Sequence, residues 1–143
     1  MNRFRRTVLL AAAFAVALSM AVWAAAFPEG RGPKGQMRTY SLANGVEKLT
    51  ARGVTADAKP TLVKYEARYD GKDYDMTGSI GGDKIALRRV DAQTTESTQK
   101  RDGKPAVVAT RTVSADGKTL TVVSAGTLPD GRKVDSTLIF ERR

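Results

Sequence analysis

The side chains that most often perform chemistry in proteins are partly missing from this chain, which has no histidine and no cysteine. A Ser-His-Asp triad, a His- or Cys-ligated zinc site and a disulfide are therefore excluded. Serine and threonine are abundant, but a hydroxyl nucleophile needs a base, and nothing in the sequence positions a lysine for that role. We expect a protein that is not an enzyme.

Carboxylates are the remaining candidates for a chemical site. Seven of the ten aspartates fall in predicted turns, where an aspartate side chain accepts hydrogen bonds from nearby backbone N–H groups. The segment DGKDYD, with Asp70, Asp73 and Asp75, only partly resembles an acidic calcium loop, because the spacing and the later glutamate of that loop are absent. We therefore predict no metal site and no cofactor.

The elements that position these residues are predicted to be strands. From Gln36 onward, short runs that alternate apolar and polar residues are separated by turn signals roughly every 9 to 14 residues. Eight turn signals separate nine runs, and no run has the apolar spacing of a helix. In TLVKYEARY, for example, Val63, Tyr65, Ala67 and Tyr69 share one face.

Three Asp-Gly steps, at Asp102, Asp116 and Asp130, recur every 14 residues and set the predicted strand register. A three-residue loop at Pro129-Asp130-Gly131 places Leu120, Val122, Ser124 and Leu128 on the same face as Val134, Leu138 and Phe140. A three-residue loop at Ala115-Asp116-Gly117 adds Val108 to that face, and the same rule at Asp102-Gly103 adds Thr94, Glu96 and Thr98. A two-residue loop at Asp70-Gly71 instead keeps Tyr65 and Tyr69 beside Met76.

Strands of this length favour a barrel. Eleven-residue strands span roughly 35 Å, and closing a long meander removes its two exposed edges. We predict an all-β fold, an antiparallel up-and-down meander of about nine strands forming a lipocalin-like barrel or half-barrel, preceded by an N-terminal signal-peptide helix.

The N-terminal 26 residues are typical of a secretory signal peptide. The basic MNRFRR is followed by a long apolar run and by Ala24-Ala25-Ala26, which fits the cleavage site. Three segments are therefore predicted: a signal peptide at 1–26, an irregular leader at 27–35, and a β-domain at 36–143. The alternative is a retained membrane anchor, since about 20 apolar residues could span a bilayer.

The charge of the predicted mature chain limits its partners. Removing three arginines from the 24 basic residues leaves 21, against 15 acidic residues, a net charge of +6. These charges are scattered and few aromatic residues accompany them, which argues against a nucleic-acid partner. We expect a periplasmic or secreted protein whose partner is a small amphipathic ligand or a component of the envelope, and which meets the membrane only through the signal peptide.

The predicted register also selects residues that would line an interior site. The segment AQTTESTQKR, at 92–101, has no apolar face, so it either adds polar groups to a cavity or forms a hydrated edge strand. Arg89 follows Ile85 and Leu87 on their face and could pair with an anionic ligand or with Glu96. The candidate lining residues are Tyr65, Tyr69, Met76, Leu87, Arg89, Glu96, Val108, Leu120, Val122, Leu138 and Phe140.

Several blocks of the chain resemble a family of small exported bacterial proteins with no established activity. They are QMRTY, YDGKDYDMTG, IALRRVDAQTTESTQKRDGK and RTVSADGKTLTVVSAGT, and the similarity covers residues 36–142. The closing strands more distantly resemble the end of lipocalin-like and fatty-acid-binding-protein-like barrels, which implies a calycin-type barrel with an interior ligand. The Arg-x-Tyr that fatty-acid-binding barrels carry on the last strand is replaced here by Leu138-Ile139-Phe140.

Two classes of function follow. The first is an exported lipocalin-like domain that binds a small amphipathic or apolar ligand. The second is a non-catalytic structural or protein-interaction module of the cell envelope, whose interior is filled by its own side chains. The volume enclosed by the sheet distinguishes the two classes.

Overall fold

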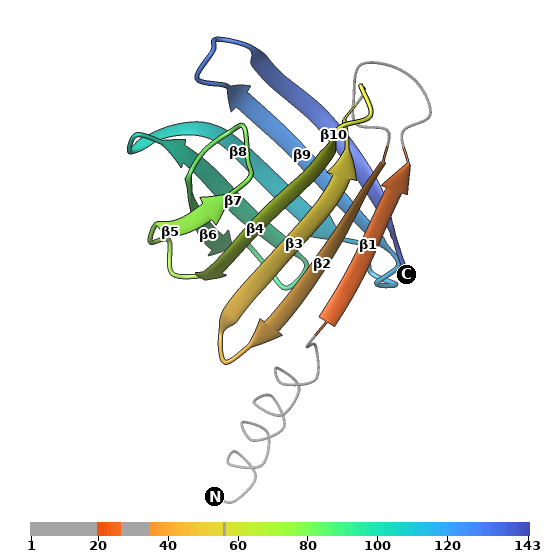
Figure 1. Cartoon of the computed structure of the whole chain (residues 1–143). Coiled ribbons are helices and arrows are strands. Elements are labelled where there is room, and N and C mark those ends of the chain that lie inside the picture. The colour runs from red at the N-terminus through yellow and green to blue at the C-terminus, as the bar shows by residue number, and fades with distance from the viewer. Residues whose placement is uncertain (1–19, 27–34, 56) are drawn as a thin grey trace, which may run out of the picture.

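The chain folds as a curled antiparallel β-sheet (Figure 1). The computed structural model describes residues 20–26, 35–55 and 57–143, and everything in it that is regular is strand. The strands are β1 (Met20–Ala26), β2 (Gly35–Ala43), β3 (Val46–Val54), β4 (Pro60–Arg68), β5 (Tyr74–Thr77), β6 (Lys84–Arg89), β7 (Thr94–Arg101), β8 (Lys104–Val113), β9 (Thr119–Thr127) and β10 (Lys133–Arg142).

Strands β2 to β10 form the predicted up-and-down meander. Each strand pairs antiparallel with its neighbour in sequence, and together the nine strands curl into a half-barrel (Figure 1). The all-β class and the nine strands after Gln36 are therefore confirmed. Strand β1 bridges the two edges of the half-barrel, pairing with β2 from Met20↔Ser41 to Ala26↔Gly35 and with β10 only at Trp23↔Arg142 and Ala24↔Glu141.

The N-terminal prediction meets the structure only in part. Residues 1–19, and 27–34 of the predicted leader, lie outside the described residues, while Gly35 already opens β2. Residues 20–26, predicted as the end of a signal-peptide helix, are strand β1 instead. The edges of β2 and β10 explain this, because each offers a row of backbone N–H and C=O groups that an apolar segment can pair with.

The core consists of two apolar clusters on the concave side of the sheet. Residues from β3 to β6 form the first cluster, and residues from β8 to β10 form the second. The side chains of Leu87, Val122 and Phe140 are almost completely buried, and Tyr40 packs against both clusters. The guanidinium of Arg38 on β2 lies 5.0 Å from the ring centre of Phe140, so a side-chain contact also links β2 to β10.

The predicted three-residue loop between β9 and β10 is confirmed. Leu128 N–H donates to the Arg132 carbonyl at 2.8 Å, which closes the loop Pro129-Asp130-Gly131. In the resulting register Leu120 lies opposite Phe140, and Val122 lies opposite Leu138. The predicted register across Asp70-Gly71 is also confirmed, because Tyr65 lies opposite Met76. The predicted two-residue loop is not, because β4 ends at Arg68 and β5 begins at Tyr74, which leaves residues 69–73 between the two strands.

The loop between β8 and β9 is one residue longer than predicted, and the faces of β8 are therefore reversed. Ser114 N–H donates to the Thr119 carbonyl at 2.8 Å, which leaves four residues, 115–118, in the loop. Arg111 then lies opposite Val122, on the inner face, and Val108 lies on the outer face with 39% of its surface exposed. A shift of one residue turns every side chain of a strand to the other side of the sheet.

The same shift moves Glu96 to the outside. Strand β7 keeps its predicted relation to β8, because Thr98 lies opposite Val108 and Glu96 opposite Thr110, but both strands present the other face to the interior. The Asp102-Gly103 loop itself has two residues rather than three, with positive φ at both, and a bulge at Gln99/Lys100 restores the relation. Glu96 pairs on the outside with Arg88, at 3.1 Å, and not with Arg89.

Candidate functional site

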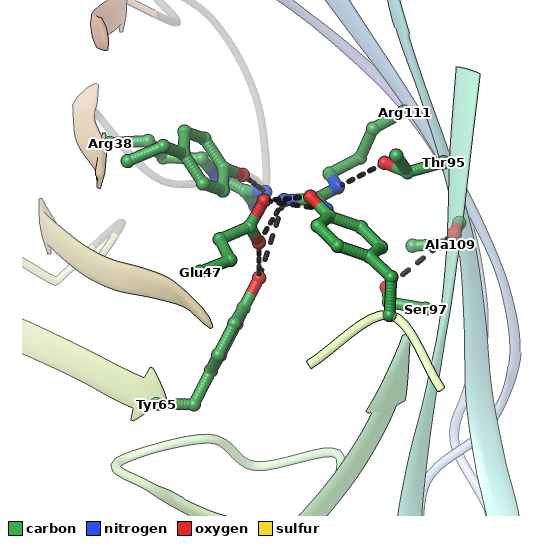
Figure 2. A network of polar contacts seen from close by, with 9 residues as sticks. Arg38, Glu47, Tyr65, Thr95, Ser97, Ala109 and Arg111 are labelled. Carbon is green, nitrogen blue, oxygen red and sulfur yellow. Dashed lines mark hydrogen bonds and ion pairs between the residues drawn. The ribbon is translucent and has the colours of Figure 1, made fainter. Parts of the chain in front are cut away.

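A buried ion pair lies inside the half-barrel. Nη1 of Arg111 on β8 donates to Oε1 of Glu47 on β3 at 3.0 Å, and Nη2 donates to Oε2 at 3.4 Å (Figure 2). Each residue exposes only 6% of its surface. The two-point geometry is the strongest form of an arginine–carboxylate contact. The ion pair therefore links β3 to β8 across the interior of the half-barrel.

Tyrosine and threonine hydroxyls complete the hydrogen bonding of this pair. Tyr65 OH donates to Glu47 Oε1 at 2.6 Å, and Tyr69 OH donates to Glu47 Oε2. Arg111 Nε donates to Thr95 Oγ1 at 3.0 Å, and the guanidinium carbon lies 4.8 Å from the ring centre of Tyr40. Within the described part of the chain, no buried side-chain nitrogen or oxygen lacks a partner. The interior charges are thus fully satisfied by the protein itself.

The network also sets the ionisation of its members. Burial raises the pKa of Glu47, but the charge of Arg111 and the hydroxyl donors of Tyr65 and Tyr69 outweigh burial, so the pKa lies below its usual value. Burial, together with the negative charge of Glu47, raises the pKa of Tyr69 above that of a free tyrosine. Glu47 is therefore a carboxylate and Tyr69 a neutral hydroxyl donor at neutral pH.

A pocket opens beside the ion pair, at the end of the sheet that carries the β2–β3, β6–β7 and β8–β9 turns. Its volume is about 210 Å³. Most of its lining is apolar, and the side chains of Tyr40, Leu42, Val113 and Leu120 form that part. The charged members are Glu47, Arg89, Arg111 and Arg142. Gln93 and Thr95 add neutral polar groups.

Comparison with known proteins adds no relative to this picture. No family model, curated protein or solved structure matches the chain. The resemblance to exported bacterial proteins and to lipocalin-like barrels therefore stays a prediction. Among the residues the structure describes, no helix is long and apolar enough to cross a membrane, and no three acidic side chains cluster as metal ligands would.

The predicted lining residues divide into three groups. Tyr69, Arg89 and Leu120 line the pocket, and Tyr65 lies beneath it in the hydrogen-bond network. Five others belong to the packed core and not to the pocket wall: Met76, Leu87, Val122, Leu138 and Phe140. The predictions for Val108 and Glu96 are wrong, because both side chains lie on the outer face.

Sequence reasoning missed the two residues at the centre of the site. Glu47 shares a face with Leu49 and Ala51, both buried, so a charged residue on an apolar strand face was a signal available in VEKLTA. Arg111 shares a face with Ala109 in the same way, but the predicted β8–β9 loop assigned that face to the outside. Identifying Arg111 required the correct length of one loop.

Proposed function

We propose that this domain is an exported, periplasmic protein that binds a small amphipathic ligand in the pocket beside the Glu47–Arg111 pair. The observation that supports the proposal is the convergence of apolar walls and fixed polar groups on one concave, solvent-accessible site, which is typical of ligand pockets. The signal-peptide pattern of residues 1–26 supports the location, and cleavage after Ala26 would remove β1 while leaving strands β2 to β10, which carry the pocket.

The volume of the pocket limits the size of the ligand. About 210 Å³ equals the space of roughly seven water molecules, and a cavity of about 150 Å³ can hold benzene. The ion pair closes the inner end, where an apolar chain would meet charges that are already paired. The bound portion is therefore compact, about the size of a substituted benzene ring, and not an extended fatty-acid chain.

The ligand would pack against walls that the protein already holds in place. Leu42, Val113 and Leu120 offer the apolar surface against which its body would pack. The Glu47–Arg111 pair is held rigidly by three hydroxyls, so the walls of the pocket are in place before the ligand arrives. Such preorganisation reduces the entropy lost on binding.

The experiment is native mass spectrometry of the protein purified from the periplasm. We expect a co-purifying small molecule, and we expect its loss in Ala92→Trp, which places an indole at the pocket wall from an exposed turn. Ala125→Trp, on the exposed outer face of β9, is the matched control and should retain the molecule. Absence of any ligand across independent preparations would contradict the proposal.

A second function is favoured by one observation. The side chains of Phe140, Leu87 and Val122 are fully packed, and the ion pair occupies the centre, so most of the interior is filled by the protein itself. A non-catalytic structural or interaction module of the envelope needs no more than this. Ligand-free protein with unchanged stability in Ala92→Trp is the result that module predicts.

A further inference from the structure

The rim of the pocket carries a positive charge that no carboxylate of the described residues balances. Of the four charged side chains in the lining, Glu47 and Arg111 neutralise each other, which leaves Arg89 and Arg142. Across the described residues, no carboxylate oxygen lies within 4.0 Å of either guanidinium. Both residues are exposed at the pocket end of their strands. The unpaired charge at this site is therefore cationic.

Strand geometry directs both arginines toward the interior side. Arg89 follows the buried Ile85 and Leu87 at alternate positions of β6, and Arg142 follows the buried Phe140 on β10. The guanidinium carbon of Arg89 lies 4.7 Å from the ring centre of Tyr69. Stacking occupies the flat face of the guanidinium and leaves its N–H edge free to donate to a ligand. The backbone N–H of Arg142 donates to the Lys118 carbonyl at 2.9 Å, which fixes the end of β10.

The buried arginine cannot take this role. All three guanidinium nitrogens of Arg111 already donate, to Glu47, to Thr95 and to the hydroxyls of Tyr65 and Tyr69. The carboxylate of an acid placed against Arg111 would also lie beside the Glu47 carboxylate. Two neighbouring negative charges repel strongly in a buried site. An anionic group is therefore accommodated at the rim and excluded from the floor.

We propose that the ligand is a small organic acid, and that Arg89 and Arg142 select it by binding its carboxylate while its body packs against the apolar wall near Leu120. This inference rests on the proposed function, since it names the chemical class of the ligand that the pocket takes. The pocket volume of about 210 Å³ limits that class to compact acids of the size of benzoate.

The test compares three probes that share one ring and differ in charge. Binding of benzoate, benzyl alcohol and benzylamine is measured by calorimetry on the purified protein after it has been unfolded in urea, dialysed, refolded and shown by native mass spectrometry to be ligand-free. We expect benzoate to bind about threefold to tenfold more tightly than the alcohol, because two exposed charge contacts contribute modestly, and benzylamine to bind most weakly. Raising the salt concentration should reduce the preference for benzoate, since these contacts are exposed and screened.

Three arginine variants locate the preference. Arg89→Gln and Arg142→Gln should each weaken benzoate binding about threefold while leaving the alcohol unchanged. Arg52→Gln removes the same charge from an exposed position that does not line the pocket, and should leave benzoate binding at the wild-type level. Because all three positions are exposed, the variants are expected to fold, and circular dichroism checks this.

The failures of the two proposals are distinguishable. Equal affinity for benzoate and benzyl alcohol, unchanged in the arginine variants, overturns the anionic class and leaves the pocket as a binding site. A lower affinity for benzoate in Arg52→Gln than in Arg89→Gln also overturns the assignment of Arg89 to the binding of the carboxylate. Absence of benzoate binding overturns this inference in the same way, and the proposed function falls with it only if the native mass spectra show no ligand.

Discussion

The buried Glu47–Arg111 pair makes a sharp prediction about stability. Glu47→Gln keeps the shape of the side chain but removes the charge that Arg111 is paired with, at 3.0 Å in a site where both residues are 6% exposed. Breaking a buried pair in this way typically costs about 3 to 5 kcal/mol, because the remaining charge is left without compensation. For a domain of this size the loss lowers the melting temperature by roughly 10 to 20 °C.

A matched control lies on the neighbouring strand pair. Glu66→Gln makes the same chemical change in the cross-strand pair of Glu66 with Lys48, whose atoms are 3.1 Å apart but whose side chains are 63% and 59% exposed. Exposed pairs contribute about 0 to 1 kcal/mol, so this variant should unfold at nearly the wild-type urea concentration. The two variants differ in burial and not in chemistry.

The double variant Glu47→Leu/Arg111→Met completes the test. It removes both charges, so no uncompensated charge remains, and it should be more stable than Glu47→Gln alone. It should not recover fully, because the hydroxyls of Tyr65, Tyr69 and Thr95 lose their partners. Urea unfolding measures all three free energies. A loss of unfolding free energy in Glu47→Gln no greater than that in Glu66→Gln would show that burial does not make the Glu47–Arg111 pair important for stability.

Three further predictions concern the Glu47 carboxylate, the register of β8 and the close approach of Gly78 to β4. The pKa of Glu47 in the folded protein lies below the usual 4.5, so the stability that Glu47 contributes is present above pH 4.5 and is lost as the pH falls through the folded pKa. The free energy of unfolding should therefore decline more steeply with acid in the wild type than in the double variant. Val107 is 5% exposed and Val108 is 39% exposed, so Val107→Asp should destabilise the protein by about 3 kcal/mol or more and Val108→Asp by less than about 1 kcal/mol. Thermal unfolding measures both losses, and the reverse order would contradict the register of β8. Gly78 and Gly71 both have a positive φ, but only at Gly78 would an added Cβ overlap the Leu62 carbonyl. Gly78→Ala should therefore destabilise the protein by several kcal/mol and Gly71→Ala by only about 1 kcal/mol. Equal losses in urea unfolding would exclude that overlap as the cause.

Much of the fold could be predicted because its turns are chemically explicit. Pro129 presets φ for a type I turn and Gly131 accepts a φ of 88°, so the loop length and the register of β9 and β10 follow from three residues. The Asn44-Gly45 turn is equally explicit, with positive φ at both positions between the paired Ala43 and Val46.

The site was harder to predict because it depends on one loop whose signal is weaker. Ala115 has no ring to fix φ, and Ser114 Oγ accepts a hydrogen bond from Thr119 N–H while donating to Asp116, so the loop extends to Lys118. The one additional residue in this loop exchanges the inner and outer faces of β7 and β8 relative to the prediction. It therefore also places Arg111 on the inner face. Period-two patterns give the faces of each strand, but only the turns decide which face is inside.

The binding of a small acid in the pocket is tested most directly by mapping benzoate on the ¹⁵N-labelled domain by NMR. Amide shifts should move at the pocket, at Gln93, Thr95 and Val113, and stay constant on the outer face, at Val108 and Ala125. We expect shifts that saturate at the pocket and that disappear in Ala92→Trp. Shifts confined to other surfaces, or none at saturating benzoate in protein shown to be ligand-free, would contradict it.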